Sequence, residues 1–117
     1  MGDRGNIRIR QPYAESEGPQ YIYLYSHWSG YLLWDILKTA LLRRQRWTDP
    51  AYLARIIFDV MTQDASSPET GYGIATDPPD NSYPFLTVDT VAQTVGIGDG
   101  SPIPFEEYLK LTTDPRT

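Results

Sequence analysis

The sequence contains no cysteine, a single histidine (His27) and no long apolar run. Without cysteine the chain has no disulfide framework, no thiolate zinc site and no cysteine nucleophile. No stretch approaches the roughly 18 apolar residues of a transmembrane helix, which argues against a membrane partner. The first residues also lack the apolar segment of a signal peptide, so we expect a cytoplasmic protein.

The charge balance is acidic, with a formal net charge of −5 at pH 7. Binding to nucleic acid depends on many contacts of Lys and Arg with phosphates, so this balance disfavours a nucleic-acid partner. The charges are unevenly distributed, because the segment from Asp59 to Asp99 contains acids and no Lys or Arg. We expect an electrostatic field with a basic N-terminal half and an acidic middle.

The chain has enough apolar residues for a core, since 40% of its 117 residues are hydrophobic. This content argues against disorder along most of the chain, and the length predicts one domain, residues 1–117. Nine tyrosines are many for this length. Tyrosine joins a large contact area to a polar tip, so an excess of it is found both in small β cores and at binding faces.

Alternating apolar residues predict a strand over residues 5–11 and a second strand over residues 21–28. Their short connection favours antiparallel pairing. The chain after residue 70 is expected to be β, with a short helix or a last edge segment over residues 105–111, and fraying over residues 114–117. Three further strands are expected at residues 71–76, 83–88 and 93–97.

Two amphipathic helices are predicted between these groups of strands. The first has Ser29 as its N-cap and runs to about Gln45, with basic residues near its C-terminus that complement the helix dipole. The second begins at Thr48-Asp49-Pro50, because Thr or Asp can cap a helix and proline suits its first turn, and it ends near Gln63.

The order strand–strand–helix–helix–strand–strand–strand, without alternation of strands and helices, predicts an α+β single domain. We expect an antiparallel sheet of about five strands with the two helices packed on one face. The apolar side chains of the first two strands should then face the helices; these are Ile7, Ile9, Ile22 and Leu24.

This packing leaves arginines and tyrosines of the first two strands on the other sheet face. Rings next to guanidinium groups suit a flat anionic ligand, because rings stack on a base and Arg binds phosphate or carboxylate. Two other interpretations stay open: cross-strand pairs on an ordinary surface, and a protein interface, which also favours Tyr and Arg. The candidate ligand-binding residues are Asn6, Arg8, Arg10, Tyr21, Tyr23, Tyr25, His27 and Tyr72.

Tyr72 joins this set because it lies in Glu69-Thr70-Gly71-Tyr72-Gly73, where two glycines allow a ligand or partner to approach the backbone closely. A bulged edge strand is the alternative interpretation. Elsewhere, the acidic segment 77–81 lacks the spacing of an EF-hand. The glycines at 96, 98 and 100 lack the helix of a phosphate-binding loop. We expect no metal site and no cofactor.

His27 would be the general base if the protein were an enzyme, since histidine exchanges protons most readily near neutral pH. A partner group is lacking in the sequence around it. Ser26 points to the opposite sheet face, and Ser29 is occupied as the expected N-cap. We therefore predict no catalytic residue, with His27 as the candidate in the enzyme alternative.

Five segments carry a resemblance to known sequences: RGNI at 4–7, IYLYSHWSG at 22–30, WTDPAYLARIIF at 47–58, ETGYGI at 69–74 and DNSYP at 80–84. Over about residues 4–95 the chain resembles a family of small uncharacterised proteins from actinobacteria and their phages. The resemblance transfers no catalytic residue. It implies an accessory protein of a phage or mobile element, a class that includes inhibitors of host defence.

We therefore expect a non-enzymatic binding protein that inhibits host defence by binding a host protein or by sequestering a small anionic, nucleotide-like ligand. One alternative is a small hydrolase or nucleotide-processing enzyme that uses His27. Another is a structural or interaction protein whose tyrosine face self-associates into a homo-oligomer.

Overall fold

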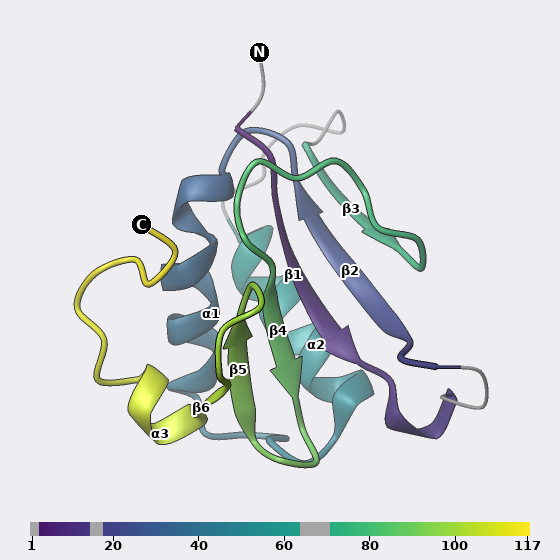
Figure 1. Cartoon of the computed structure of the whole chain (residues 1–117), viewed down its shortest axis with the longest axis vertical. Helices are drawn as coiled ribbons and strands as arrows, with labels where there is room; N and C mark the ends of the chain where they lie inside the picture. Colours follow the sequence, from purple (N-terminus) through teal and green to yellow (C-terminus); the bar gives the residue numbers. More distant parts are fainter. Residues whose placement is uncertain (1–2, 15–17, 64–70) are drawn as a thin grey trace.

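One mixed sheet underlies the fold of the computed structural model, in which residues 3–14, 18–63 and 71–117 are described. Within these residues the sheet has six strands and carries both of the longer helices on one face, so that its other face is turned toward the viewer in Figure 1. The predicted α+β class and the packing of two helices on a single face are confirmed.

The strands are β1 (Gly5–Arg10), β2 (Tyr21–Ser26), β3 (Tyr72–Ala75), β4 (Leu86–Asp89), β5 (Thr94–Ile97) and β6 (Ile103–Pro104). The helices are α1 (Leu33–Leu41), α2 (Pro50–Met61) and the short α3 (Phe105–Tyr108). Two 3-10 turns, η1 (Pro12–Ala14) and η2 (Gly30–Leu32), follow β1 and precede α1.

The strand order is β3-β2-β1-β4-β5-β6. The predicted antiparallel pairing of β1 with β2 is confirmed, and it places Arg8 opposite Tyr23. The expectation of a fully antiparallel sheet of about five strands is wrong, because β4 lies parallel to β1 and β6 adds a sixth strand. The connection after β3 returns across the ends of β2 and β1 before it enters β4 (Figure 1), so β4 runs in the same direction as β1.

The core lies between the sheet and the two helices. Ile7, Ile9 and Leu24 are buried there as predicted, and Ile22 packs against the core from its margin. Each helix contributes the stripe expected from its periodicity. The buried helical residues are Leu33, Leu37, Ala40 and Leu41 of α1, and Leu53, Ile57 and Met61 of α2.

The start of α1 differs from the prediction that Ser29 caps it. The Ser29 side chain makes no capping hydrogen bond, and its backbone N–H donates to Ser26 Oγ at 2.9 Å. The turn η2 precedes the helix instead, and the backbone amide of Tyr31 in η2 donates to Asp3 Oδ2 at 2.9 Å. The N-terminal segment therefore supplies the carboxylate that binds η2, a long-range contact that the neighbouring residues do not indicate.

The end of α1 also differs, since the helix stops at Leu41 and not near Gln45. Arg44 and Arg46 have φ values of 53° and 60°, in the left-handed region that ends a right-handed helix. At α2 the prediction is confirmed: Asp49 Oδ1 accepts hydrogen bonds from the backbone N–H groups of Ala51 and Tyr52, and proline occupies the first turn.

We expect Asp49→Ala to lower the free energy of unfolding by about 1 kcal/mol, because two amides of the first turn lose their acceptor. Urea denaturation followed by circular dichroism measures the change. Asp49→Ser is the matched control and should retain most of the stability, since a serine hydroxyl caps nearly as well. Equal losses in both variants would contradict the capping role.

Candidate functional site

Arg8 occupies the centre of the exposed sheet face because β1 is flanked by β2 and β4. Its guanidinium carbon lies 4.1 Å from the ring centre of Tyr21 and 4.7 Å from that of Phe85. Its Nε donates to Thr87 Oγ1 at 2.8 Å. Within the described part of the chain, no hydrogen bond uses its two terminal nitrogens. The side chain is thus held in place while its anion-binding end stays available.

Arg10, two residues further along the same face, differs because it has an acidic partner. Its Nη1 lies 3.0 Å from Asp89 Oδ2, and both side chains are partly shielded from solvent. Asp89 also accepts hydrogen bonds through Oδ1 from the amides of Val91 and Ala92 in the turn that follows β4. Arg10 is therefore neutralised locally, whereas Arg8 forms no ion pair with any of the described residues.

The tyrosines of β2 lie on the same sheet face as Arg8 and differ in how deeply they are buried. Tyr23 is buried, with its ring centre 6.1 Å from that of Tyr21 and 5.7 Å from that of Phe85. Tyr25 lies further along the strand, where its hydroxyl is 2.7 Å from His27 Nδ1. The structure therefore divides the predicted residues into a cluster around Arg8 and a separate Tyr25–His27 pair.

Two other predicted residues lie away from this cluster. Asn6 is fully buried, and its Nδ2 donates to the Asp80 carbonyl oxygen at 3.2 Å, so it holds the segment that crosses the sheet end. Tyr72 pairs with Ser26 across β2 and β3 and packs against the core, on the helix-covered face. Glu69 and Thr70, which belong to the same sequence motif as Tyr72, lie outside the described residues.

His27 is held by a contact of its ring and by a hydrogen bond of its backbone. Its ring packs edge-on against Trp28 at 5.0 Å between centres, and its backbone N–H donates to the Gly71 carbonyl oxygen at 2.7 Å. Among the described residues no carboxylate or serine hydroxyl bonds to the ring. They also hold no group of three or more His, Asp or Glu arranged to bind a metal ion. Nor is any of their helices long and apolar enough to cross a membrane.

A hollow next to Arg8 contains residues that sequence analysis did not single out. It has a volume of about 470 Å³, and Arg8 forms one wall. The rings of Tyr83 and Phe85 and the carboxylate of Asp99 line the rest. The period-two pattern of residues 83–88 placed Phe85 and Thr87 on one face. Nothing in the sequence placed that face next to Arg8. The full lining is Arg8, Asn81, Tyr83, Pro84, Phe85, Gly98 and Asp99.

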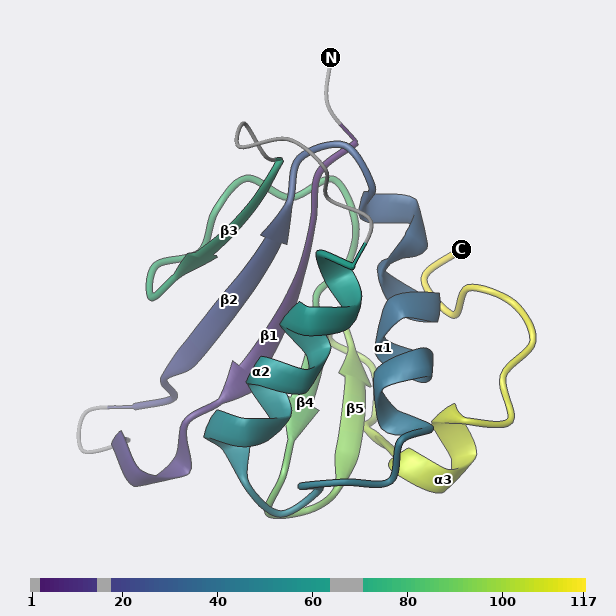
Figure 2. The ribbon, with the colours of Figure 1, turned by 180° about the vertical axis from the view of Figure 1, so that it is seen from behind.

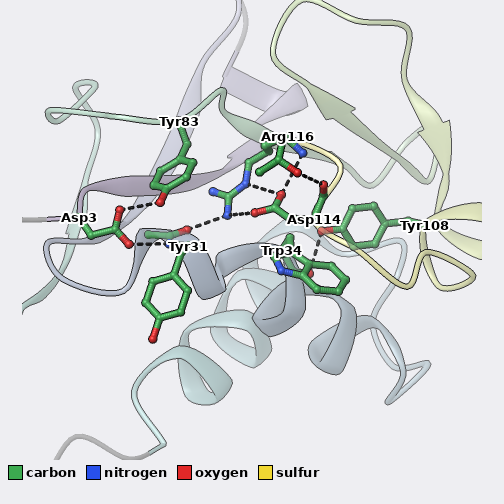
Figure 3. Close-up of polar contacts among 9 residues, drawn as sticks. Asp3, Tyr31, Trp34, Tyr83, Tyr108, Asp114 and Arg116 are labelled. Carbon is green, nitrogen blue, oxygen red and sulfur yellow. Dashed lines mark hydrogen bonds and ion pairs between the residues drawn. The ribbon is translucent and has the colours of Figure 1, made fainter.

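The position of Tyr83 depends on both ends of the chain, as Figure 3 shows. Its hydroxyl donates to Asp3 Oδ1 at 2.7 Å, and this hydrogen bond raises the pKa of Tyr83. On the other side, the guanidinium carbon of Arg116 lies 4.4 Å from the centre of the Tyr83 ring. Residues 3 and 116 together fix one wall of the hollow.

Arg116 is fully buried, so the expected fraying of residues 114–117 is wrong. Its Nη2 donates to the Gly30 carbonyl oxygen at 2.7 Å and lies 2.9 Å from Asp114 Oδ2, while its Nε donates to Asp114 Oδ1 at 3.0 Å (Figure 3). The C-terminal segment is thereby attached to the start of η2. A single arginine near a chain end gives no sequence signal of this burial.

Comparisons of the chain with protein-family models, with curated proteins and with solved structures each found no significant match. The geometry of the site and the chemistry of its residues are therefore the basis for a functional proposal.

Arg116→Met should lower the free energy of unfolding by about 3 kcal/mol, because it leaves the largely buried Asp114 carboxylate without its partner. Urea denaturation measures the loss. Arg55→Met is the matched control: it removes an exposed ion pair with Asp59 and should cost less than about 1 kcal/mol. Similar losses in the two variants would contradict the larger contribution to the free energy of unfolding that we expect from the buried Arg116.

Stability should also fall in alkali because of Tyr108, whose hydroxyl donates to the Trp34 carbonyl oxygen at 2.8 Å. Burial raises the pKa of Tyr108 above its ordinary value, so folding favours the neutral form. The contribution is complete below about pH 10 and is lost as the pH rises beyond it. Urea denaturation between pH 8 and about pH 11 should show this slope, reduced in Tyr108→Phe. An unchanged slope in that variant would refute the assignment.

Proposed function

We propose that the protein is a non-enzymatic binding protein that holds a small anionic, nucleotide-like ligand on the exposed sheet face, with Arg8 as its anion-binding group. The proposal rests on one observation, which is how the Arg8 side chain is held and which of its nitrogens stay without a hydrogen bond. Two rings and one hydroxyl hold its side chain, and its two terminal nitrogens make no hydrogen bond within the described residues.

The energetic reason is preorganisation. A free arginine side chain loses up to about 2 kcal/mol of rotamer entropy when it is ordered. Here much of that cost has been met in folding, because Tyr21 and Phe85 flank the guanidinium and Thr87 binds Nε. The two terminal nitrogens form the fork that matches two oxygens of a phosphate or carboxylate. An anion therefore gains most of the interaction energy with little further ordering.

The hollow next to Arg8 adds the features that favour a nucleotide over a simple anion. Its volume of about 470 Å³ falls within the range of small-molecule sites. The rings of Tyr83 and Phe85 offer surfaces on which a base can stack. Asp99 repels phosphate but accepts hydrogen bonds from an amino or hydroxyl group. The ligand is expected to lie with its phosphate on Arg8 and its hydrogen-bond donors toward Asp99.

In the cell, we propose that this binding sequesters a nucleotide signal of a host defence system, in the cytoplasm, on behalf of a phage or mobile element. The resemblance described for residues 4–95 supports this role. Protection of phage from such a defence system on expression of the wild type, lost with Arg8→Ala, would support it. Equal protection by both forms would refute it.

Isothermal titration against a panel of mono-, di- and cyclic nucleotides tests the site directly. We expect at least one to bind wild type in the micromolar range. Arg8→Ala should weaken that binding by roughly 10-fold to 100-fold, because a hydrogen bond to a charged group contributes about 1.5–3 kcal/mol. Arg8→Lys should recover part of the loss, since it restores charge without the planar fork.

Lys110→Ala is the control, because Lys110 is exposed and pairs with Glu107 on α3. It should bind the ligand as wild type does. Two results would refute the proposal: no heat of binding from any nucleotide at high micromolar concentration, or equal affinities of wild type and Arg8→Ala.

A further inference from the structure

The helix layer does not cover the whole sheet. Figure 2 shows α1 and α2 in front of the sheet and β3 beyond the edge of α2. The consequence is an open hollow of about 420 Å³ between α2 and the strands β2 and β3. Ile74 of β3 is 62% exposed there, although its partner Leu24 on β2 belongs to the core. The lining residues are Gln11, Ile22, Leu24, Ala51, Ala54, Arg55, Phe58 and Ile74.

A second hollow, of about 470 Å³, lies on the other side of Arg55. Its other lining residues are Gln45, Arg46, Tyr52 and Ile56. Tyr52 is 57% exposed, and the guanidinium carbon of Arg46 lies 4.4 Å from its ring centre. Because Arg55 lines both hollows, they form one continuous surface along α2, which we call the α2 surface.

The α2 surface has a positive charge in a protein whose net charge is −5. Arg46 and Arg55 line it, and the described lining contains no Asp or Glu. Arg46 makes no ion pair within the described residues. Arg55 pairs with Asp59 one helical turn away, but this pair is exposed and contributes little. An acidic partner is therefore attracted to this surface, whereas the acidic residues elsewhere repel it.

The backbone around Arg46 supports a role beyond ordinary surface. Arg46 has a φ of 60°, a left-handed conformation that costs a non-glycine residue energy. That conformation accompanies the placement of its guanidinium over Tyr52 at the edge of the hollow. The strained backbone and the charge of Arg46 therefore lie together at the edge of this hollow.

We infer that the α2 surface docks an acidic amphipathic helix of a partner protein. Its apolar side chains would enter the hollow around Phe58 and Ile74, and its carboxylates would meet Arg46 and Arg55. A helix fits this position because it would continue the layer of α1 and α2 over β3 and bury the exposed apolar area of the sheet. The surface lies on the opposite side of the sheet from Arg8.

Two other occupants fit the surface less well. A second copy of the chain would have to supply an acidic apolar helix, yet the apolar stripes of α1 and α2 are buried in its own core, as are Phe105 and Tyr108 of α3. A nucleic acid would leave the apolar hollow without a complementary group, and the net charge opposes it.

The test selects peptides of about 16 residues, roughly four helical turns, from a displayed random library on the immobilised full chain. We expect the enriched sequences to carry apolar residues at helical spacing flanked by Asp or Glu. By fluorescence anisotropy, Ile74→Glu and Arg46→Glu should each weaken the selected peptides at least 10-fold. Both positions are exposed, so circular dichroism should show that both variants fold.

Lys110→Glu makes the same charge change just after α3 and should leave peptide binding unchanged. Arg8→Ala should also leave it unchanged, which separates this surface from the proposed ligand site. The inference is overturned if no peptide is enriched, if the enriched peptides lack acidic residues, or if they bind both variants as tightly as wild type. It is also overturned if a labelled single-stranded oligonucleotide binds through Arg46 and displaces the peptides, because the surface would then be a polyanion site.

Discussion

β1 is hydrogen-bonded along both edges, antiparallel to β2 and parallel to β4, and the rest of the structure depends on this central position. Because successive side chains of a strand point to opposite faces, β1 serves two tasks at once. Ile7 and Ile9 are buried under the helices and anchor the core. Arg8 points the other way, where it contacts the Tyr21 ring of β2 and donates a hydrogen bond to the Thr87 hydroxyl of β4. A strand at the sheet edge would have only one of these neighbours.

The two ends of the chain form a second constraint, which acts on the same site. Asp3 accepts hydrogen bonds from the Tyr31 amide of η2 and from the Tyr83 hydroxyl, and Arg116 packs on the other side of that tyrosine. A buried ion pair such as Arg116–Asp114 contributes little net stability compared with apolar packing, since desolvation offsets its attraction. Its role is geometric, because Nε and Nη2 of the buried guanidinium bond to Asp114 and to the Gly30 carbonyl oxygen. Here it holds the segment of residues 114–117 against the Gly30 carbonyl.

The two faces of the sheet divide the proposed tasks. On the open face, the unmatched Arg8 lies beside a hollow with rings and one carboxylate, which suits a small anionic ligand. On the helix face, β3 extends beyond α2 and leaves Ile74 exposed beside Arg46 and Arg55, which suits an acidic apolar helix. Both arginine clusters occur in a chain with a net charge of −5, so each is a local exception to the field of the molecule.

The sequence by itself determined the features that depend on near neighbours. Periodicity identified β1, β2 and both helices, cap chemistry located the start of α2 at Asp49, and strand alternation placed Ile9 in the core and Arg8 on the open face. These features follow from repeats of two or 3.6 residues and from bonds between groups a few positions apart. The same local patterns placed the tyrosines of β2 on the face of Arg8, since the short connection favoured an antiparallel pair; the register that sets Tyr23 opposite Arg8 came from the structure.

Only the tertiary structure decided which distant segments meet. Periodicity states that residues 86–89 form a strand, but it does not state on which side of the sheet, or in which direction, that strand pairs. Phe85 and Thr87 therefore joined Arg8 only once β4 was seen parallel to β1, and Tyr72 proved to lie on the helix face only once β3 was seen paired with β2. Asp3 came to bind the Tyr31 amide of η2, and Arg116 became buried, for the same reason. Each contact joins residues far apart in the chain. Its energy depends on a distant partner, which the neighbouring residues in the sequence do not identify.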